Sequence, residues 1–176
     1  MSLQGKVALV TGASRGIGKA IAQQLAAQGA IDVGTATTEA GAQAISAYLQ
    51  TMNAQGAGMA LDVTQADSID EFLSAIQNQF GAPVILVNNA GITKDGLLLR
   101  MKDSDWDAVI NTNLTAIFRL SKACLKGMSK ARWGRIINIS SVVGQMGNAG
   151  QTNYAAAKAG LEGFTRALAK EMGGRG

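Results

Sequence analysis

Short apolar runs alternate along the chain with longer stretches in which apolar residues have helical spacing. Residues 6–11 (KVALVT) form a β-branched, apolar run that leads into a glycine, which is typical of a strand buried on both faces of a parallel sheet. From Ile17 to Leu25 apolar residues recur at helical spacing, and Gly29 follows where a left-handed cap is favoured. This pattern predicts a strand followed by a helix.

The same alternation continues through the rest of the chain. It predicts strands over residues 31–35, 58–61, 84–88 and 135–140, and helices over residues 40–52, 68–80, 106–128 and 153–172. Alternating strands and helices predict an α/β fold, a Rossmann-like, doubly wound parallel sheet with helices on both faces. Asp32 lies inside the weakest of these strands, and we expect it to disturb or shorten that strand.

Composition favours a single folded domain. The 176 residues are 47% hydrophobic, which suffices for one sizeable core, and no linker or low-complexity tract divides them. We therefore predict one dinucleotide-binding and catalytic domain over residues 1–176. The net charge of +4 is mild and lacks the dense Lys/Arg stripe of a nucleic-acid-binding protein, so it suggests an anionic ligand or an acidic partner.

Cysteine content and hydropathy suggest a cytoplasmic protein. Cys124 is the only cysteine, which excludes an intrachain disulfide and fits a reducing compartment, and we expect it to be a buried, inert thiol on a helix. The start of the chain, Met1 to Lys6, lacks the layout of a signal peptide, and no apolar run approaches the length of a membrane helix.

The chain contains no histidine. Ser-His-Asp hydrolysis, Cys-His catalysis and His-ligated zinc are therefore excluded, and we expect no metal site. Acid–base chemistry must come from Tyr, Lys, Asp, Glu or Cys.

A glycine-rich loop, TGASRGIG, directly follows the first predicted strand and opens the first predicted helix. Gly12 allows a tight exit from the strand, Gly16 allows the backbone to approach a pyrophosphate, and Gly18 allows close helix packing. A glycine trio alone could be a structural turn, but a strand before it and a helix after it favour dinucleotide binding.

The end of the second predicted strand bears on the choice of cofactor. Sites that prefer NAD usually place a carboxylate there, and this strand ends without one. Arg15 and the hydroxyls of Thr37 and Thr38 could accept a 2′-phosphate, which favours NADP (NADPH), although Arg15 could also be simply solvated. Asp62, after the third strand, could meet the adenine.

Two asparagines follow the fourth predicted strand. Small residues and amides at this edge of the sheet suit both close contact with a cofactor and hydrogen bonds between strands. From the sequence, a structural role for Asn88 and a cofactor contact by Asn89 are equally open.

Tyr154 and Lys158 are four residues apart, on one face of the last predicted helix. A free tyrosine has a pKa near 10, and a neighbouring cation lowers it, so we expect Lys158 to make Tyr154 a proton donor. Lys158 could also hold the nicotinamide ribose, and Ser141 at a strand end could hydrogen-bond a carbonyl oxygen. The pair alone could be a solvated helix face; together with the glycine loop it indicates catalysis.

The chain resembles the short-chain dehydrogenase/reductase family, and within it the bacterial 3-oxoacyl-[acyl-carrier-protein] reductases. The resemblance is carried by TGASRGIG, GTAT, LVNNAGIT, LLLRMK, ARWGRIIN, SSVVGQMGNAGQTNYAAAKAGLEGF and the last helix. It implies NADPH-dependent reduction of 3-oxoacyl-ACP to 3-hydroxyacyl-ACP in fatty acid biosynthesis.

The resemblance also implies site residues. It gives a catalytic tetrad of Asn113, Ser141, Tyr154 and Lys158, in which Asn113 holds a water of the proton relay; the residues alone do not distinguish Asn113 from Asn111. It further implies contacts of Arg132 and Arg175 with an acidic carrier protein, although each could be a solvated arginine, and a homotetramer. The implied cofactor contacts are Gly12, Ser14, Arg15, Gly18, Thr37, Asp62, Val63, Asn89, Gly91, Tyr154 and Lys158.

Two features depart from the family pattern. Family chains normally continue beyond Gly176 with two more strands and a substrate-covering segment, so we expect the C-terminal part of the domain to be missing here. Gly96 stands where a polar side chain is common. Two alternatives therefore remain open: a reductase of acetoacetyl-CoA or another ketone, and an inactive NADP-binding fragment.

Overall fold

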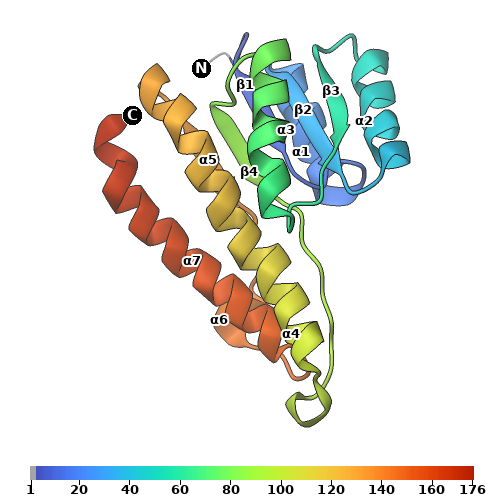
Figure 1. The fold of residues 1–176 in the computed structure, drawn as a ribbon, viewed down its shortest axis with the longest axis vertical. Coiled ribbons are helices and arrows are strands. Elements are labelled where there is room, and N and C mark those ends of the chain that lie inside the picture. Colours follow the sequence, from blue (N-terminus) through green and yellow to red (C-terminus); the bar gives the residue numbers. More distant parts are fainter. Residues whose placement is uncertain (1–2) are drawn as a thin grey trace.

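The computed structural model describes residues 3–176 as a parallel sheet between two layers of helices (Figure 1). Met1 and Ser2, part of the start on which the signal-peptide expectation rests, lie outside the described residues. The sheet has five strands in the order β3-β2-β1-β4-β5, and every adjacent pair is parallel. The predicted Rossmann-like α/β fold is thereby confirmed.

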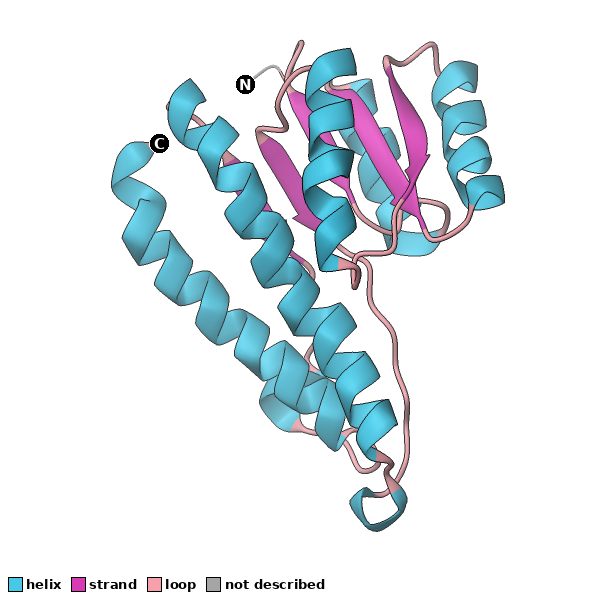
Figure 2. Cartoon of the chain, viewed as in Figure 1, coloured by secondary structure: helices cyan, strands magenta, loops and turns pink. Residues whose placement is uncertain are grey.

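Strands and longer helices alternate in the predicted order (Figure 2). The strands are β1 (Val7–Val10), β2 (Ile31–Ala36), β3 (Gly56–Ala60), β4 (Ile85–Asn88) and β5 (Arg135–Asn138). The α-helices are α1 (Gly16–Ala27), α2 (Glu39–Thr51), α3 (Ala66–Gln79), α4 (Asp103–Ile110), α5 (Ala116–Ala131), α6 (Val143–Met146) and α7 (Thr152–Met172). Short turns complete the set: the 3-10 helices η1 (Leu98–Arg100) and η3 (Gly173–Arg175), and the π-helix η2 (Asn111–Thr115).

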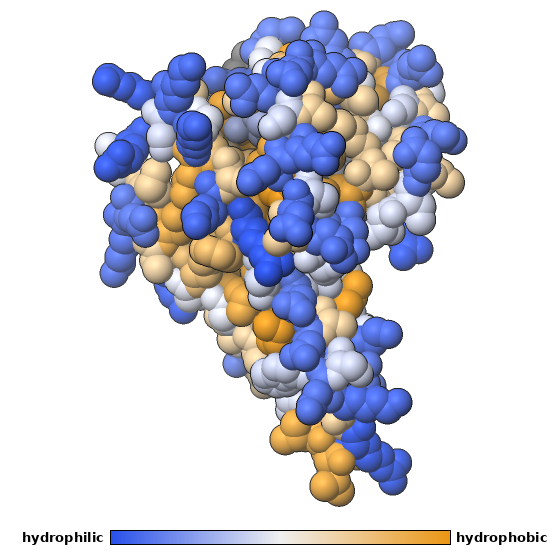
Figure 3. Space-filling model, viewed as in Figure 1, coloured by the Kyte–Doolittle hydropathy of each residue, from blue (hydrophilic) through white to orange (hydrophobic). Residues whose placement is uncertain are grey.

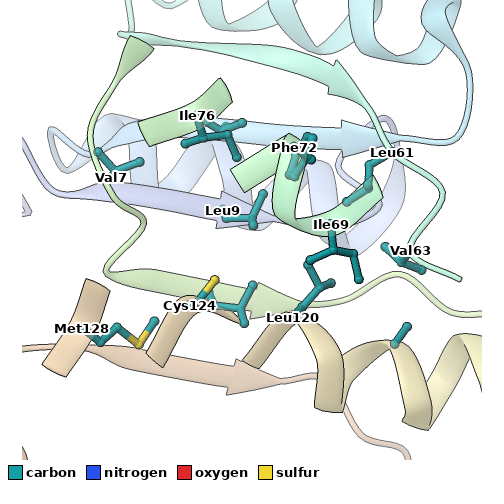
Figure 4. Packing of buried hydrophobic residues seen from close by; sticks show 13 residues of the cluster. Val7, Leu9, Leu61, Val63, Ile69, Phe72, Ile76, Leu120, Cys124 and Met128 are labelled. Carbon is teal, nitrogen blue, oxygen red and sulfur yellow. The ribbon is translucent and has the colours of Figure 1, made fainter. Parts of the chain in front are cut away.

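The sheet separates two hydrophobic clusters because successive side chains of a strand point to opposite faces. On one face, Leu9 and Leu86 pack with α3 and α5 through Phe72, Ile76 and Leu120 (Figure 4). On the other face, β1, β2 and β4 pack against the alanine-rich side of α1 and against α2. Cys124 belongs to the first cluster, where burial raises the pKa of its thiol to about 12, so the expected buried, inert thiol is confirmed.

Three local features differ from the predicted elements. β2 runs over six residues, so the expectation that Asp32 would disturb or shorten the strand was wrong. The strand keeps its length because ladder hydrogen bonds engage only the backbone of Asp32. The helix predicted over 106–128 is interrupted by the π-turn η2 between α4 and α5. The short helix α6 was not predicted, since four residues carry no periodic signal.

The last helix forms the outer wall of the side that carries α5. Its first half packs on α4, α6 and η2, whereas its second half borders an apolar groove of about 290 Å³ beside β5. β5 is the edge strand, and its Ile137 side chain is 44% exposed. No helix among residues 3–176 is both long and apolar enough to cross a membrane.

Candidate active site

A cavity of about 510 Å³ opens at the carboxyl edge of the sheet, between β1 and β4. At this point the strand order reverses direction, which is where doubly wound sheets bind ligands. Nine of the predicted cofactor contacts line this single cavity. They are Gly12, Ser14, Arg15, Gly18, Thr37, Asp62, Val63, Asn89 and Gly91.

The glycine loop is braced by its neighbours. The Asn89 side-chain amide donates to the carbonyl oxygens of Thr11 (2.9 Å) and Gly12 (3.2 Å). The Tyr48 hydroxyl on α2 donates to the Ala13 carbonyl oxygen at 3.1 Å, and the Ala13 N–H donates to the Thr35 carbonyl oxygen at 2.8 Å. These bonds hold the backbone of the loop in one conformation.

The same loop leaves the start of α1 ready for an anion. Arg15, which precedes the helix, makes no side-chain capping bond, so the first N–H groups of α1 are not satisfied by a cap. Gly16 has a φ of +56°, and a Cβ there would meet no atom within 4 Å, so the space over the turn is open. A Cβ on Gly18 would instead collide with the Gly12 carbonyl oxygen, which explains the requirement for glycine.

The ends of β2 and β3 form the far side of the cavity. Thr37 lines it, whereas the Thr38 hydroxyl accepts a hydrogen bond from the Gly41 N–H (3.1 Å) as the N-cap of α2. Of the two threonines considered for a 2′-phosphate, Thr37 is therefore the one at the cavity. Hydrogen bonds from the Thr64 hydroxyl and N–H lower the pKa of Asp62, so this exposed carboxylate stays ionised.

Two asparagines lie at the end of β4: Asn88 is its last residue, and Asn89 follows it. The buried Asn88 amide donates to Asn138 Oδ1 at 2.8 Å and to Ser121 Oγ at 3.4 Å, which ties β4 to β5 and α5. Asn89 lines the cavity, but its amide nitrogen is engaged with the glycine loop. Both side chains therefore support the structure, and Asn89 also shapes the cavity wall.

The first turns of α7 bring Tyr154 and Lys158 together. The Lys158 ammonium lies 5.7 Å from the centre of the Tyr154 ring, and Lys158 is only 4% exposed. Its Nζ donates to the Ile139 carbonyl oxygen at 2.7 Å, just beyond β5. Burial lowers the pKa of Lys158. An ammonium has three donors, so two remain for other partners.

Ser141 lies in the turn that follows β5. Its Oγ accepts a hydrogen bond from the Val143 N–H at 3.2 Å, which leaves the hydroxyl proton for donation. The next helix, α6, packs tightly on α7: a Cβ on Gly144 would lie 3.0 Å from the backbone of Lys158. The serine turn and the Tyr154/Lys158 helix are thus held against each other.

Asn113 lies in the π-turn η2 and is fully buried. Its Nδ2 donates to the Ile92 carbonyl oxygen (2.7 Å), and its Oδ1 accepts from the Ile92 N–H (2.9 Å). The side chain therefore holds the loop after β4, and Thr112 beside it lines the cofactor cavity. π-turns occur often at functional sites. Asn111, the alternative from the residues alone, is exposed.

The two arginines expected to contact a carrier protein lie at the other end of α7 from Tyr154. Arg132 ends α5 in a left-handed conformation (φ 49°), and Arg175 lies in η3, beyond α7. Both are exposed. The Gly134 N–H donates to the Gly176 carbonyl oxygen at 3.3 Å, so the two segments are adjacent (Figure 1).

Sequence reasoning missed several supporting residues. The Thr11 hydroxyl accepts from the N–H groups of Asn89 and Ala90, both at 3.0 Å, and so joins the ends of β1 and β4. Arg119 on α5 donates to the Thr64 carbonyl oxygen at 3.1 Å. Asn153 bonds to two distant backbone carbonyls. All three act on the backbone of remote segments, a role that no local sequence signal reveals.

The fold and the site define a dinucleotide-binding oxidoreductase with a tyrosine–lysine pair. The family model described as short chain dehydrogenase matches residues 6–176, and the chain belongs to this family. It is 65% identical over 175 residues to the 3-oxoacyl-[acyl-carrier-protein] reductase FabG of Pseudomonas aeruginosa, covering 99% of this chain and 71% of that protein. The identities to the same-named proteins of Vibrio cholerae and Escherichia coli K12 are 64% and 61%, each over the whole chain and 71% of the relative.

Members of this family use a nicotinamide cofactor, and the cavity fits one. The uncapped start of α1 suits a pyrophosphate, the open space over Gly16 leaves room for it, and Asp62 stands at the far end. Among residues 3–176, no cluster of three or more Cys, Asp or Glu side chains is arranged to hold a metal ion.

Proposed function

We propose that this protein is an NADPH-dependent 3-oxoacyl-[acyl-carrier-protein] reductase of fatty acid biosynthesis. The observation that carries the proposal is the combination of the Tyr154/Lys158 pair with the dinucleotide cavity, in a chain 61–65% identical to curated reductases of that name. The substrate is a 3-oxoacyl thioester, and the product is the 3-hydroxyacyl thioester.

Each residue of the tetrad has a role that its contacts support. The nicotinamide cofactor, when bound, supplies the hydride that reaches the 3-keto carbon. Tyr154 donates its phenolic proton to the keto oxygen, and the Ser141 hydroxyl donates a hydrogen bond to the same oxygen as negative charge develops. Lys158 would hold the ribose hydroxyls with its two remaining donors, and its ammonium lies 5.7 Å from the centre of the Tyr154 ring.

Asn113 acts through its backbone. Both polar atoms of its side chain are engaged with Ile92, so its part in the proton relay falls to its main-chain carbonyl in the π-turn. The side chain meanwhile fixes the loop after β4 against η2.

The cofactor form is NADPH. Thr37 lines the cavity at the end of β2, and the exposed Arg15 faces the same cavity, so both suit a 2′-phosphate. The carboxylate of β2 itself, Asp32, is fully buried and cannot take the place of the acidic residue of an NAD site.

The acyl group is delivered by an acyl carrier protein that docks on Arg132 and Arg175. Helix α7 has 21 residues, so its ends are about 30 Å apart, with Tyr154 at one end and Arg175 beyond the other. A carrier docked on these arginines therefore serves the active site of another copy more readily than that of its own chain. This favours an assembly of several copies, which we propose to be a homotetramer. We place the enzyme in the cytoplasm, in keeping with its single, buried thiol.

NADPH oxidation with an acetoacetyl thioester tests the proposal. We expect turnover by the 176-residue chain and a loss of at least about 1,000-fold in Tyr154→Phe, because phenylalanine has no proton to donate to the keto oxygen. NADPH titration should give the same affinity for both proteins. Equal turnover in the variant, or no turnover by the parent chain despite NADPH binding, would contradict the proposal.

A further inference from the structure

The loop between β4 and α4 is exposed along almost its whole length. All of residues 91–100 except Gly96 are exposed, and the side chains of Leu97, Leu98 and Leu99 are 62%, 66% and 96% exposed. Figure 3 shows hydrophobic residues at the narrow end of the molecule, where this loop lies. Buried apolar contacts therefore do not hold the loop, and its position depends on hydrogen bonds.

Those hydrogen bonds run mainly to the segment that leads into α7. The Gly96 N–H donates to the Gly150 carbonyl oxygen at 2.8 Å, and Gln151 Nε2 donates to Asp95 Oδ1 at 3.1 Å. Asn153 Nδ2 donates to the Lys94 carbonyl oxygen at 3.0 Å. Among these partners, only Asn153 is fully buried, so its bond is shielded from competition by water.

The Asn153 side chain joins three elements. Its Nδ2 also reaches the Asp105 carbonyl oxygen on α4, at 3.4 Å, and its Oδ1 accepts from the N–H of Tyr154 at 2.8 Å. Gln151, the residue before α7, gives no side-chain capping bond, so Asn153 satisfies one of the free N–H groups at the helix start. The residue that contacts the loop is thus bonded to the backbone of the catalytic tyrosine.

We propose that Asn153 is a positioning residue for the reduction, which locks the β4–α4 loop and α4 to the start of α7 and thereby fixes the place of Tyr154. This inference rests on the proposed function, because it concerns the residue that donates the proton. The contacts that hold the loop and α4 are the two hydrogen bonds that the Asn153 amide nitrogen donates, to the carbonyl oxygens of Lys94 and Asp105. The bond accepted from Tyr154 alone would make Asn153 a helix cap and nothing more.

Variants at this position separate the two roles. Asn153→Asp keeps an oxygen for the Tyr154 N–H and is an equally good helix cap, but it has no N–H to donate to Lys94 or Asp105. Asn153→Ser is neutral and also caps, and its shorter side chain does not span to the Lys94 carbonyl. The serine variant keeps the test valid if a buried carboxylate prevents folding. Asn78→Asp, the same change at an exposed position of α3, is the matched control.

Two measurements test the proposal. At saturating cofactor and thioester, we expect kcat to fall about 100-fold in Asn153→Asp and in Asn153→Ser. A loss of this size is typical when a catalytic group, here Tyr154, is misplaced by about 1 Å. The NADPH dissociation constant should stay unchanged. The control should keep the parent rate. Hydrogen exchange of residues 91–101 should be faster in both Asn153 variants than in the parent chain.

Three outcomes would overturn the proposal. Parent-like kcat in both variants would show that Asn153 is only a helix cap. A loss of NADPH affinity that parallels the loss of rate would show general damage to the fold. Unchanged hydrogen exchange of the loop would show that Asn153 does not hold it. Exchange does not need turnover, so it tests the lock even if the parent chain fails to reduce the thioester and the proposed function is wrong.

Discussion

Asp32 is a carboxylic acid inside the hydrophobic layer between the sheet and α2. It is fully buried, and among residues 3–176 neither of its side-chain oxygens has a hydrogen-bond partner. Burial raises its pKa from 3.8 to about 7. The Tyr48 phenol is the titratable group nearby: burial raises its pKa, and the charge of Asp32 raises it further. Below about pH 7, β2 therefore holds the Asp32 carboxyl mainly in its neutral form.

This residue makes the stability of the fold depend on pH. The folded protein binds a proton that the unfolded chain releases near pH 3.8, so the contribution of Asp32 to stability falls as pH rises from about 4 to about 7. In Asp32→Asn, which removes the charge and keeps the shape, we expect the gain in unfolding free energy over the parent to be about 3 kcal/mol larger at pH 8 than at pH 5. Urea unfolding at the two pH values measures it. If the difference in unfolding free energy between variant and parent were the same at both pH values, the pKa of Asp32 would not be raised in the folded protein, and the account of Asp32 would be wrong.

At the scale of elements, helix α5 holds part of the cavity wall in place although its Arg119 does not line the cavity. Arg119 holds the carbonyl of Thr64, and Thr64 in turn bonds to Asp62 at the cavity wall. The position of this loop therefore depends on a side chain that does not line the cavity.

Removing that support should weaken cofactor binding without affecting the chemistry. We expect Arg119→Ala to raise the KM for NADPH by about tenfold, since a hydrogen bond from a charged group contributes about 1.5–3 kcal/mol when partly buried, and to leave kcat unchanged. Steady-state kinetics with varied NADPH measures both constants. Lys126→Ala, on the exposed side of the same helix, should change neither. A fall in kcat at constant KM would place Arg119 in the chemistry instead.

The strands and most of the helices could be predicted from the sequence because each buries a periodic apolar face. The glycine loop and the Tyr154/Lys158 pair were equally readable, since a strand–glycine–helix context and a four-residue spacing are local signals. The π-turn at Asn113 was not, because its apolar spacing continues that of α4 and α5. The Asn153 side chain bonds to Lys94, 59 positions earlier in the chain, and to Asp105, 48 positions earlier. No local sequence pattern encodes contacts over such separations.

At the scale of the whole molecule, catalysis and carrier docking are assigned to opposite ends of α7. The proposed docking arginines, Arg132 and Arg175, are exposed, and the segments that carry them are joined by the hydrogen bond from Gly134 to Gly176. Two aromatic side chains, Trp106 on α4 (38%) and Phe118 on α5 (48%), are exposed.

Charge reversal at the docking arginines should affect only carrier-bound substrates. In the double variant Arg132→Glu/Arg175→Glu we expect kcat/KM for 3-oxoacyl-ACP to fall at least tenfold, because an acidic partner is then repelled, and kcat/KM for acetoacetyl-CoA to stay as it is. The comparison of the two thioesters under identical salt measures the effect. The double variant Lys122→Glu/Lys126→Glu, at two exposed positions of α5, has the same net charge and is the control. A parallel fall for both thioesters would remove the arginines from carrier recognition.

The central claim is that hydride reaches the 3-keto carbon while Tyr154 supplies the proton. The most direct measurement uses NADPH deuterated at the transferable position of the nicotinamide, a 3-oxoacyl thioester and mass spectrometry of the product. The account predicts a 3-hydroxyacyl product with deuterium at C3 from the parent chain, and almost none from Tyr154→Phe. A product without deuterium, or the same yield of deuterated product from both proteins, would contradict it.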